Sequence, residues 1–489
     1  MAKIFDVNFG DRVAENEAGN LASYFVRTDN WEKVRSNTAD IVFGSKGAGK
    51  SALYTLLVAD SPKLELERRV LISAEKPKGQ PVFSEISNEP PTTEQEFVTL
   101  WKIYLCQLIV QALYTKGLCD GDAGQVRQKL IDANLMEEEN TLKRLVNSAM
   151  SFARRLTHIE SIEGKGSLEG ELGGKITFKT PDIEKRKLGY TSIDDLLEKL
   201  NGHLKSAQLD FWILFDRLDV AFDQDHDLER NALRALFKTY RDIEDQNHIV
   251  LKIFLRDDIW KRVTDDGFRE SSHITRSTTI KWTQQSLLNL IIMRVLQNPD
   301  VVALYNVDLM KLRESYAEQL ALYYKIFPEQ VDIGEKQSDT FDWILNRVRD
   351  GQGNVAPREL IHFHNEIVIQ EKEADNVGSR KVEGTNIFSR ASIKAATAEV
   401  SRVKIEQNLF AEYPALKGSI QSLEGSKAEH NLQTLSEVWK LEDDATKKLA
   451  QELVGIGFFE QLSAKEEGVF KVPFIYRPYL RITQGKAFS

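Results

Sequence analysis

Apolar residues in the first 280 positions form short, almost uninterrupted runs that amphipathic stretches separate. Runs of this kind are typical of strands buried on both faces, whereas apolar residues three and four positions apart indicate a helix. The runs predict strands at residues 40–43, 69–74, 210–216, 248–256 and 277–282. The amphipathic stretches predict helices at residues 51–58, 93–116, 194–206 and 228–243. Because strands and helices alternate, we expect an α/β fold, with a parallel sheet and helices on both of its faces.

The pattern changes after residue 282, where the strands stop and helical spacing continues. It predicts helices at residues 285–296, 309–324, 341–349, 357–372 and 389–410. Two further helices, at 431–439 and 443–455, precede a hairpin at 458–476, an order that is typical of a winged helix. These changes predict three domains, which are an α/β domain at 1–282 with an insertion around 120–190, an all-helical lid domain at 283–410 and a winged-helix-like domain at 411–489.

Length and composition indicate several domains, and they narrow the choice of binding partners and of cellular compartment. A chain of 489 residues is too long for one ordinary core, and 42% hydrophobic with 28% charged residues is usual for a globular protein. The net charge of −9 argues against a basic surface that coats nucleic acid. The two cysteines, Cys106 and Cys119, make no disulfide framework, so we expect free thiols in a reducing, cytoplasmic setting. We see no signal-peptide pattern and no apolar run long enough for a bilayer, so we expect no membrane.

One short stretch carries the main chemical signal. Residues 44–51 fit the pattern G-x-x-x-x-G-K-[ST] of a phosphate-binding loop, in the order Gly44, Ser45, Lys46, Gly47, Ala48, Gly49, Lys50 and Ser51. Glycines let backbone N–H groups turn inward and cradle phosphates. Lys50 would reach the β- and γ-phosphates, and the Ser51 hydroxyl would bind Mg²⁺. The helix that follows the loop adds an N-terminus that favours an anion. The sequence therefore predicts a P-loop ATPase domain that binds ATP and Mg²⁺.

A second motif follows the most apolar of the predicted strands. Asp216 ends the strand at 210–216 and is placed to hold Mg²⁺ through water, as a P-loop enzyme requires. Asp219, three residues later, is the candidate base or polarising group for the hydrolytic water. The alternative for this pair of aspartates is a helix cap after a strand, which the P-loop makes the weaker interpretation. We therefore assign Lys50, Asp216 and Asp219 to catalysis.

Two arginines are further candidates for contact with the nucleotide. Arg256 ends a predicted strand, and ligands of α/β sheets lie at the carboxyl ends of the strands. Arg256 would act in catalysis by sensing the γ-phosphate, or it would pair with one of the two aspartates that follow it. Arg358 begins a predicted helix of the lid, from which it would bind the nucleotide or remain solvated. The sequence leaves both alternatives open.

These motifs together resemble the STAND and KAP-type branch of AAA-related P-loop ATPases. The resemblance rests on residues 44–51, on Phe-Asp-Arg-Leu-Asp at 215–219, on Phe-Leu-Arg at 254–256 and on Pro-Arg-Glu-Leu at 357–360. The closing residues 472–480 and 484–487 are similar to a bacterial subgroup that is often encoded near anti-phage defence genes. Most AAA+ enzymes have a catalytic glutamate directly after the magnesium aspartate, and here Arg217 stands at that position. The resemblance therefore implies an ATPase with slow turnover, which suits a switch better than a motor.

Two functions compete on these grounds. The first is a regulatory ATPase of bacterial defence or signalling that binds ATP between the α/β domain and the lid and assembles with itself or with a separate effector protein. The second is a DNA-binding AAA+ protein of the initiator or loader type. DNA contact needs a face rich in lysine and arginine, and about the last sixty residues show no clear basic excess, so we favour the first. Arg276, or else Arg269, is the candidate arginine finger for the site of a neighbouring subunit.

Overall fold

The chain divides into two compact units. The computed structural model describes residues 7–12, 14–17, 19, 21–74, 93–137, 140–162, 175–177, 180–218, 226–265, 267–462 and 468–488. The α/β unit consists of Asp29–Gly44 and Lys50–Ile280, and the C-terminal unit consists of Met1–Thr28, Ser45–Gly49 and Lys281–Ser489. This division into two units does not test the three domain ranges expected from the sequence, which stay predictions.

The α/β unit is built on a parallel sheet with the strand order β2–β5–β6–β1–β7. The strands are β1 Ile41–Gly44, β2 Arg69–Ser73, β5 Asp210–Phe215, β6 Ile249–Arg256 and β7 Ser277–Thr279. Every residue of β1, and every residue of β5 after the first, is buried. This burial on both faces explains the continuous apolar runs of the sequence and confirms the predicted α/β class. Strand β6 lies between β1 and β5, and its last residue, Arg256, is in register with Gly44.

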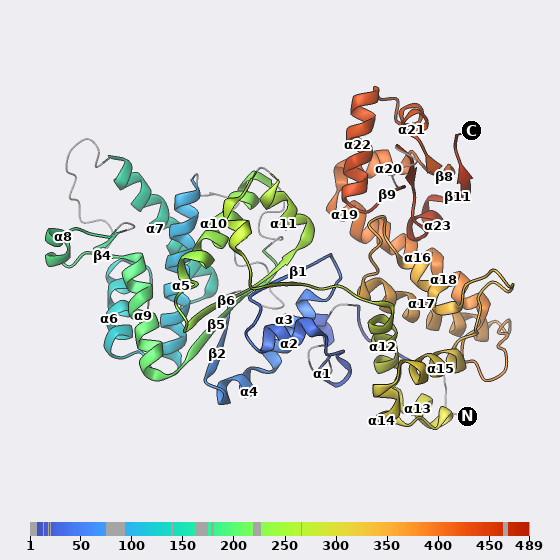
Figure 1. Cartoon of the computed structure of the whole chain (residues 1–489), viewed down its shortest axis with the longest axis horizontal. Helices are drawn as coiled ribbons and strands as arrows, with labels where there is room; N and C mark the ends of the chain where they lie inside the picture. Colours follow the sequence, from blue (N-terminus) through green and yellow to red (C-terminus); the bar gives the residue numbers. More distant parts are fainter. Residues whose placement is uncertain are drawn as a thin grey trace. The chain divides into compact units, whose positions relative to one another are not determined.

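Helices cover both faces of this sheet. They are α2 Asp29–Arg35, α3 Lys50–Ala59, α4 Ser61–Leu66, α5 Glu94–Thr115, α6 Gly121–Asp132, α7 Leu142–Ile162, α8 Ile183–Lys187, α9 Ile193–Ala207, α10 His226–Ile243 and α11 Asp257–Thr264. Two short strands, β3 Ile176–Thr177 and β4 Thr191–Ser192, pair in parallel beside them. Figure 1 shows α2 and α3 on one side of the strands and α5, α9 and α10 on the other. On the first side Tyr54 meets Phe254 edge-on at 5.9 Å between ring centroids, and on the second Trp101 meets Phe215 at 5.8 Å.

Helix α5 corrects the expectation that no apolar stretch of the chain is long enough for a bilayer. Its 22 residues are long and apolar enough to cross a membrane by length and composition alone. Within its most apolar window 83% is buried, against α7, α9, α10 and β2. Helices α12 and α13 pass the same test only as a pair bent by 103°. The apolar character of α5 is therefore accounted for by its place in the core of the α/β unit.

The C-terminal unit is mostly helical. Its helices are α1 Leu21–Tyr24, α12 Gln284–Val295, α13 Pro299–Tyr305, α14 Leu309–Glu314, α15 Tyr316–Ile326, α16 Thr340–Val348, α17 Pro357–Asn376, α18 Arg390–Val403, α19 Phe410–Glu412, α20 Lys417–Gln421, α21 Leu432–Trp439, α22 Asp443–Gly455 and α23 Arg477–Leu480. A π-helical turn, Lys404–Leu409, follows α18. One buried core contains Leu360 and Ile393 of the helical part together with Phe458 and Ile475 near the C-terminus.

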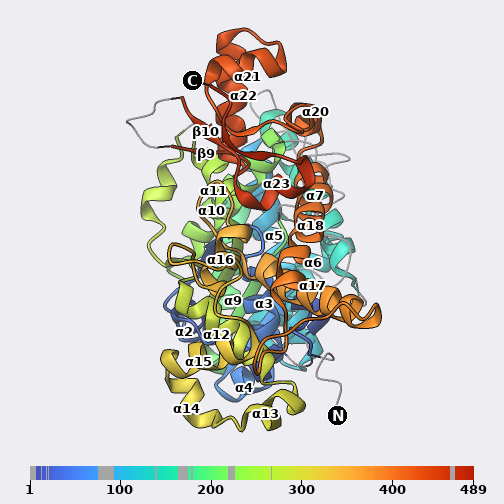
Figure 2. The same ribbon diagram turned by 90° about the vertical axis from the view of Figure 1, so that its right-hand side faces the viewer.

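The end of this unit is a winged helix, as predicted. Strand β8 is followed by α21, α22 and the antiparallel pair β9–β10, and Figure 2 shows the two helices close to this pair. The four strands have the order β11–β8–β10–β9, with β8 Lys427–His430, β9 Glu460–Gln461, β10 Phe470–Lys471 and β11 Thr483–Lys486. The backbone N–H of Tyr479 donates to Ser401 Oγ of α18 at 3.1 Å. Since the winged helix shares its core with α18, its removal would expose apolar residues of the remaining unit.

Candidate nucleotide site

Four of the predicted residues, Gly44, Lys50, Ser51 and Asp216, lie in two bonded pairs next to the ends of β1 and β5 in the α/β unit. Strand β1 ends at Gly44, and α3 begins at Lys50. Lys50 Nζ donates a hydrogen bond to the Gly44 carbonyl at 2.7 Å. The Ser51 hydroxyl donates to Asp216 Oδ2 at 3.1 Å. A hydroxyl and a carboxylate are oxygen ligands of the kind that Mg²⁺ takes, and a lysine bonded to a carbonyl is ready to exchange that bond for a phosphate oxygen.

The loop between these ends, Ser45–Gly49, belongs to the C-terminal unit. Two of its glycines have left-handed backbone angles, φ +79° at Gly47 and +102° at Gly49, which other residues adopt only with strain. A turn is closed by the Ala48 N–H, which donates to the Ser45 carbonyl at 3.1 Å. The indole N–H of Trp282 donates to the Ala48 carbonyl at 2.8 Å. The backbone conformation of the loop therefore favours glycine at positions 47 and 49.

The N-terminus of α17 lies against the same loop. A Cβ placed on Gly47 would lie 3.2 Å from Arg358 Cβ and 3.4 Å from Glu359 Oε2, so a larger residue there would have to displace these side chains slightly. Arg358 Nε and Glu359 Oε2 are buried and have no hydrogen-bond partner among the described residues. The structure thus brings the predicted Arg358 beside the phosphate loop. Lys46 Nζ pairs with Glu412 Oε2 at 2.9 Å.

Glu359 was not predicted as a site residue. Its Oε1 accepts a hydrogen bond from Lys404 Nζ at 2.7 Å, at the start of the π-helical turn. Burial alone would raise the pKa of Glu359, but the charge of Lys404 outweighs it and holds this pKa below its usual value. The carboxylate therefore stays ionised next to the loop. Only the motif Pro-Arg-Glu-Leu gave a signal at this position, and that signal pointed to the arginine.

The remaining catalytic candidates on the α/β unit have different outcomes. Asp219 lies outside the described residues. Arg217, just before it, has φ +56°, an unusual angle for a residue other than glycine and one that is often found at functional sites. Arg256 forms a two-point hydrogen bond to Asp258, at 3.0 and 2.8 Å. Of the two alternatives for Arg256, the structure shows the pairing, and the contact with a γ-phosphate stays a prediction.

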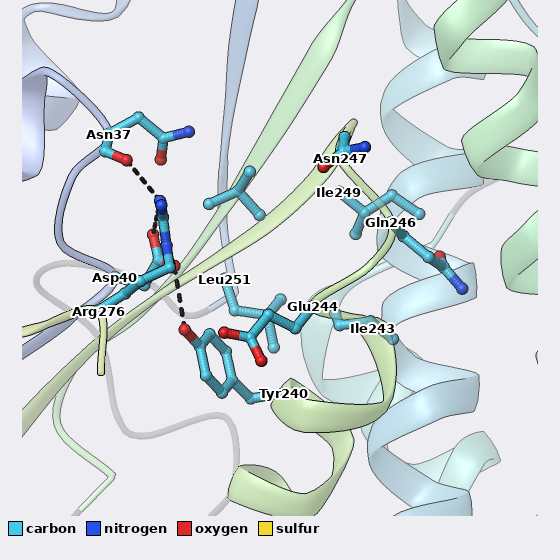
Figure 3. A pocket seen from close by; sticks show the side chains of 11 residues that line it. Asn37, Asp40, Tyr240, Ile243, Glu244, Gln246, Asn247, Ile249, Leu251 and Arg276 are labelled. Atoms are coloured by element: carbon cyan, nitrogen blue, oxygen red, sulfur yellow. Dashed lines mark hydrogen bonds and ion pairs between the residues drawn. The ribbon is translucent and has the colours of Figure 1, made fainter. Parts of the chain in front are cut away.

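Arg276 lies at the opposite edge of the sheet from Gly44 and Asp216. Asp40 and Arg276 directly precede the parallel strands β1 and β7, so both stand where the strands begin. Arg276 Nε donates to Asp40 Oδ2 at 2.5 Å, Lys252 Nζ donates to Asp40 Oδ1 at 2.8 Å, and the Tyr240 hydroxyl donates to Asp40 Oδ2 at 3.1 Å. A cavity of about 150 Å³ adjoins this cluster (Figure 3). Arg269 lies in a separate 3₁₀ turn, Arg269–His273, and a role of either arginine in another subunit stays a prediction.

Comparisons with known proteins give distant structural likenesses only. No family model and no curated protein sequence matches the chain. Among solved structures, the ORC1 protein of Aeropyrum pernix in complex with DNA is 12% identical over 96% of each chain, with a TM-score of 0.34. The ORC2 protein of the same organism, in ADPNP-ADP complexes, is 12% identical over 97% of this chain and 94% of that chain, with a TM-score of 0.41. CDC6P from Pyrobaculum aerophilum is 11% identical over 94% of this chain and 93% of that chain, with a TM-score of 0.31. Similarities this low do not carry a function to this chain.

Proposed function

We propose that the protein is a P-loop ATPase that binds ATP with Mg²⁺ and hydrolyses it slowly. The observation that carries the proposal is the pair of hydrogen bonds at the carboxyl edge of the sheet, Lys50 to Gly44 and Ser51 to Asp216. They support the proposal because a cationic group and two oxygen ligands of the kind that phosphates and Mg²⁺ need lie together in the α/β unit, next to the ends of β1 and β5. Gly47 and Gly49 give the loop the backbone angles that let N–H groups face an anion.

The substitution Lys50→Ala tests this proposal. We expect the Kd for ATP, measured by calorimetry with Mg²⁺, to rise about 10- to 100-fold, because one charge-assisted hydrogen bond to a phosphate is lost. Lys63→Ala is the matched control, since Lys63 is an exposed lysine on the next helix. Its Kd for ATP should equal that of the wild type. Unchanged ATP affinity in Lys50→Ala, with the protein still folded, would contradict the site.

We propose further that nucleotide state controls assembly, with other copies of the chain or with a separate effector, in bacterial defence or signalling in the cytoplasm. The support for a switch is that the position after Asp216 is Arg217 rather than a glutamate, so the turnover that we propose is slow. The ion pair of Lys46 with Glu412 supports coupling, since it joins the loop to α19, which precedes the winged helix in the chain with only α20 and a 3₁₀ turn between them. Light scattering with and without ATP tests the idea, and a mass that is the same in both states and in Lys50→Ala contradicts it for self-assembly.

DNA binding through the winged helix is the second candidate, and the observation in its favour is the fold of residues 427–486. In such motifs the second helix, here α22, enters the major groove. The exposed side chains of this helix include Lys447 and Lys448 but also Asp443, Asp444 and Glu452, so its charge is close to neutral. That balance is poor for phosphate contact and is the reason for placing this candidate second.

A charge-reversal experiment separates the two candidates. Lys447→Glu with Lys448→Glu should abolish salt-sensitive binding of the full chain to a DNA duplex if α22 reads DNA. Lys372→Glu with Lys381→Glu, at exposed positions of the helical part, is the control with the same change in net charge. Equal loss in both pairs indicates a non-specific charge effect, and tight binding that only the first pair removes would promote the DNA-binding candidate.

A further inference from the structure

Trp282 contacts the phosphate loop from outside the motif that defines it. Its indole N–H donates to the carbonyl oxygen of Ala48 at 2.8 Å. The ring also covers the next residue, because a Cβ built on Gly49 would lie 3.9 Å from Trp282 Cζ2. Ala48 is only 2% exposed, so the bond is made at a well-packed point of the loop. Neither the motif nor the catalytic assignments above use this tryptophan.

The hydrogen bond sets the orientation of one peptide plane. Peptide bonds throughout the described residues are trans. In a trans peptide the carbonyl of one residue and the N–H of the next point in opposite directions. Because the Ala48 carbonyl points at Trp282, the N–H of Gly49 points away from the indole. Gly49 is the residue directly before Lys50. In this part of a P-loop the backbone N–H groups donate hydrogen bonds to the phosphates.

An external donor matters here because glycine gives the loop freedom that other residues do not have. Gly49 has φ +102°, in a region that glycine enters and leaves with little cost. A peptide flanked by such a residue has low resistance to rotation, and rotation would turn the carbonyl oxygen toward the phosphates in place of the N–H. A carbonyl facing an anion repels it, so a loop free to rotate would bind phosphate more weakly. The indole N–H opposes this rotation by bonding the carbonyl on the outside.

We propose that Trp282 is a positioning residue for the phosphate loop, which holds the Ala48–Gly49 peptide so that the Gly49 N–H faces the phosphates of a nucleotide. The inference rests on the proposed nucleotide-binding function and adds a residue that acts through the loop backbone. It specifies the part of the ligand concerned: Trp282 strengthens binding of the phosphate chain and makes no contribution to binding of the base and ribose.

The test compares two tryptophan-to-phenylalanine substitutions. Trp282→Phe keeps an aromatic ring against Gly49 and removes the N–H donor. Trp439→Phe is the matched control, because the Trp439 indole N–H also donates to a backbone carbonyl, that of Ser419, at 2.9 Å in the winged helix. Both residues are half-buried, so we expect both variants to fold with a melting temperature near that of the wild type. The ligands are ATP, ADP, tripolyphosphate and adenosine, measured in competition with a fluorescent ATP analogue.

For Trp282→Phe we expect the Kd of ATP, ADP and tripolyphosphate to rise about three- to tenfold, the range that one neutral hydrogen bond supplies. The Kd of adenosine should not change, and Trp439→Phe should match the wild type for every ligand. Unchanged ATP affinity in Trp282→Phe overturns the inference. A loss for adenosine equal to that for ATP also overturns it, because the indole would then contact the base. Failure of the wild type to bind ATP refutes the proposed function itself and is a separate result.

Discussion

The two edges of the parallel sheet carry charged residues in opposite arrangements. At the amino edge, where the strands begin, Asp40 accepts hydrogen bonds from Arg276, Lys252 and Tyr240, so the charges there satisfy one another. At the carboxyl edge, Lys50 bonds a backbone carbonyl, and a hydroxyl bonds Asp216. A phosphate and a cation are able to replace the bonds at the carboxyl edge. No such exchange is available at the amino edge without leaving a buried charge alone.

On the proposed function, this difference separates charges that stabilise the fold from charges that would bind the nucleotide and its metal. Burial costs a charged group its water, and only close partners offset that cost. Burial alone would raise the pKa of Asp40, but the hydrogen bond from Arg276 and the charge of Lys252 hold it below its usual value. Burial lowers the pKa of Lys252 to about 8, although Asp40 opposes the shift. We therefore expect substitutions at the amino edge to change stability and substitutions at the carboxyl edge to change binding or turnover.

The largest expected effect is that of Asp40→Ala on stability. The Lys252 side chain is 0% exposed, so removal of its counter-charge leaves an ammonium group buried without a carboxylate. The free energy of unfolding should fall by about 3–5 kcal/mol, the range for one partner removed from a buried pair. Denaturant unfolding followed by far-UV circular dichroism measures this change.

Asp60→Ala is the control for this prediction. Asp60 also pairs with an arginine, Arg35, in the α/β unit, but that arginine keeps a second partner in Glu67. The control should therefore cost about 1 kcal/mol or less. If Asp40→Ala lowered the free energy of unfolding by no more than Asp60→Ala, the amino-edge cluster would contribute little to stability. The contrast between the two edges would then fail.

Asp219→Asn, a substitution at a residue that the sequence predicts to act in catalysis, should lower turnover and leave stability and ATP affinity near those of the wild type. A group that orients or activates the attacking water acts in the transition state, so kcat should fall about 100-fold with little change in Kd. Steady-state phosphate release gives kcat, and calorimetry gives Kd. Wild-type turnover in this variant would identify Asp219 as a helix cap, and Arg217 would then be the next residue to test.

Much of this contrast follows from local sequence, and some of it does not. The strands were predicted because buried parallel strands appear as continuous apolar runs, as at 210–216. Lys50 and Ser51 were predicted because the P-loop is a contiguous motif whose chemistry depends on spacing. Asp216 followed from its place at the end of a strand. For each of these residues the signal lies within about ten positions of the residue itself.

The contacts that the sequence did not predict join distant positions. Trp282 is 234 residues from Ala48, and Arg276 is 236 residues from Asp40. Neither pairing leaves a periodic pattern or a motif, so Arg276 was predicted as an arginine finger, and its partner Asp40 was treated only as the start of a strand. Glu359 was missed for the same reason, since its partner Lys404 is 45 residues away.

The smallest expected effect is a difference in the pH dependence of stability between the wild type and Lys252→Met, and it tests the amino edge through the titration of one lysine. The folded pKa of Lys252, about 8, lies below the value of roughly 10.4 for an unfolded lysine. Between these two values the unfolded chain binds more protons than the folded one at this site, so Lys252 makes stability rise with pH there. Tyr240 and Arg276 face the same carboxylate, but both remain in the variant Lys252→Met. The free energy of unfolding of the wild type minus that of Lys252→Met should therefore increase by up to about 1.4 kcal/mol per pH unit from pH 8 to pH 10. A difference that stays constant over this range would mean that the Lys252 proton is held as firmly in the folded protein as in the unfolded chain, and the amino-edge cluster would then not differ from an exposed ion pair.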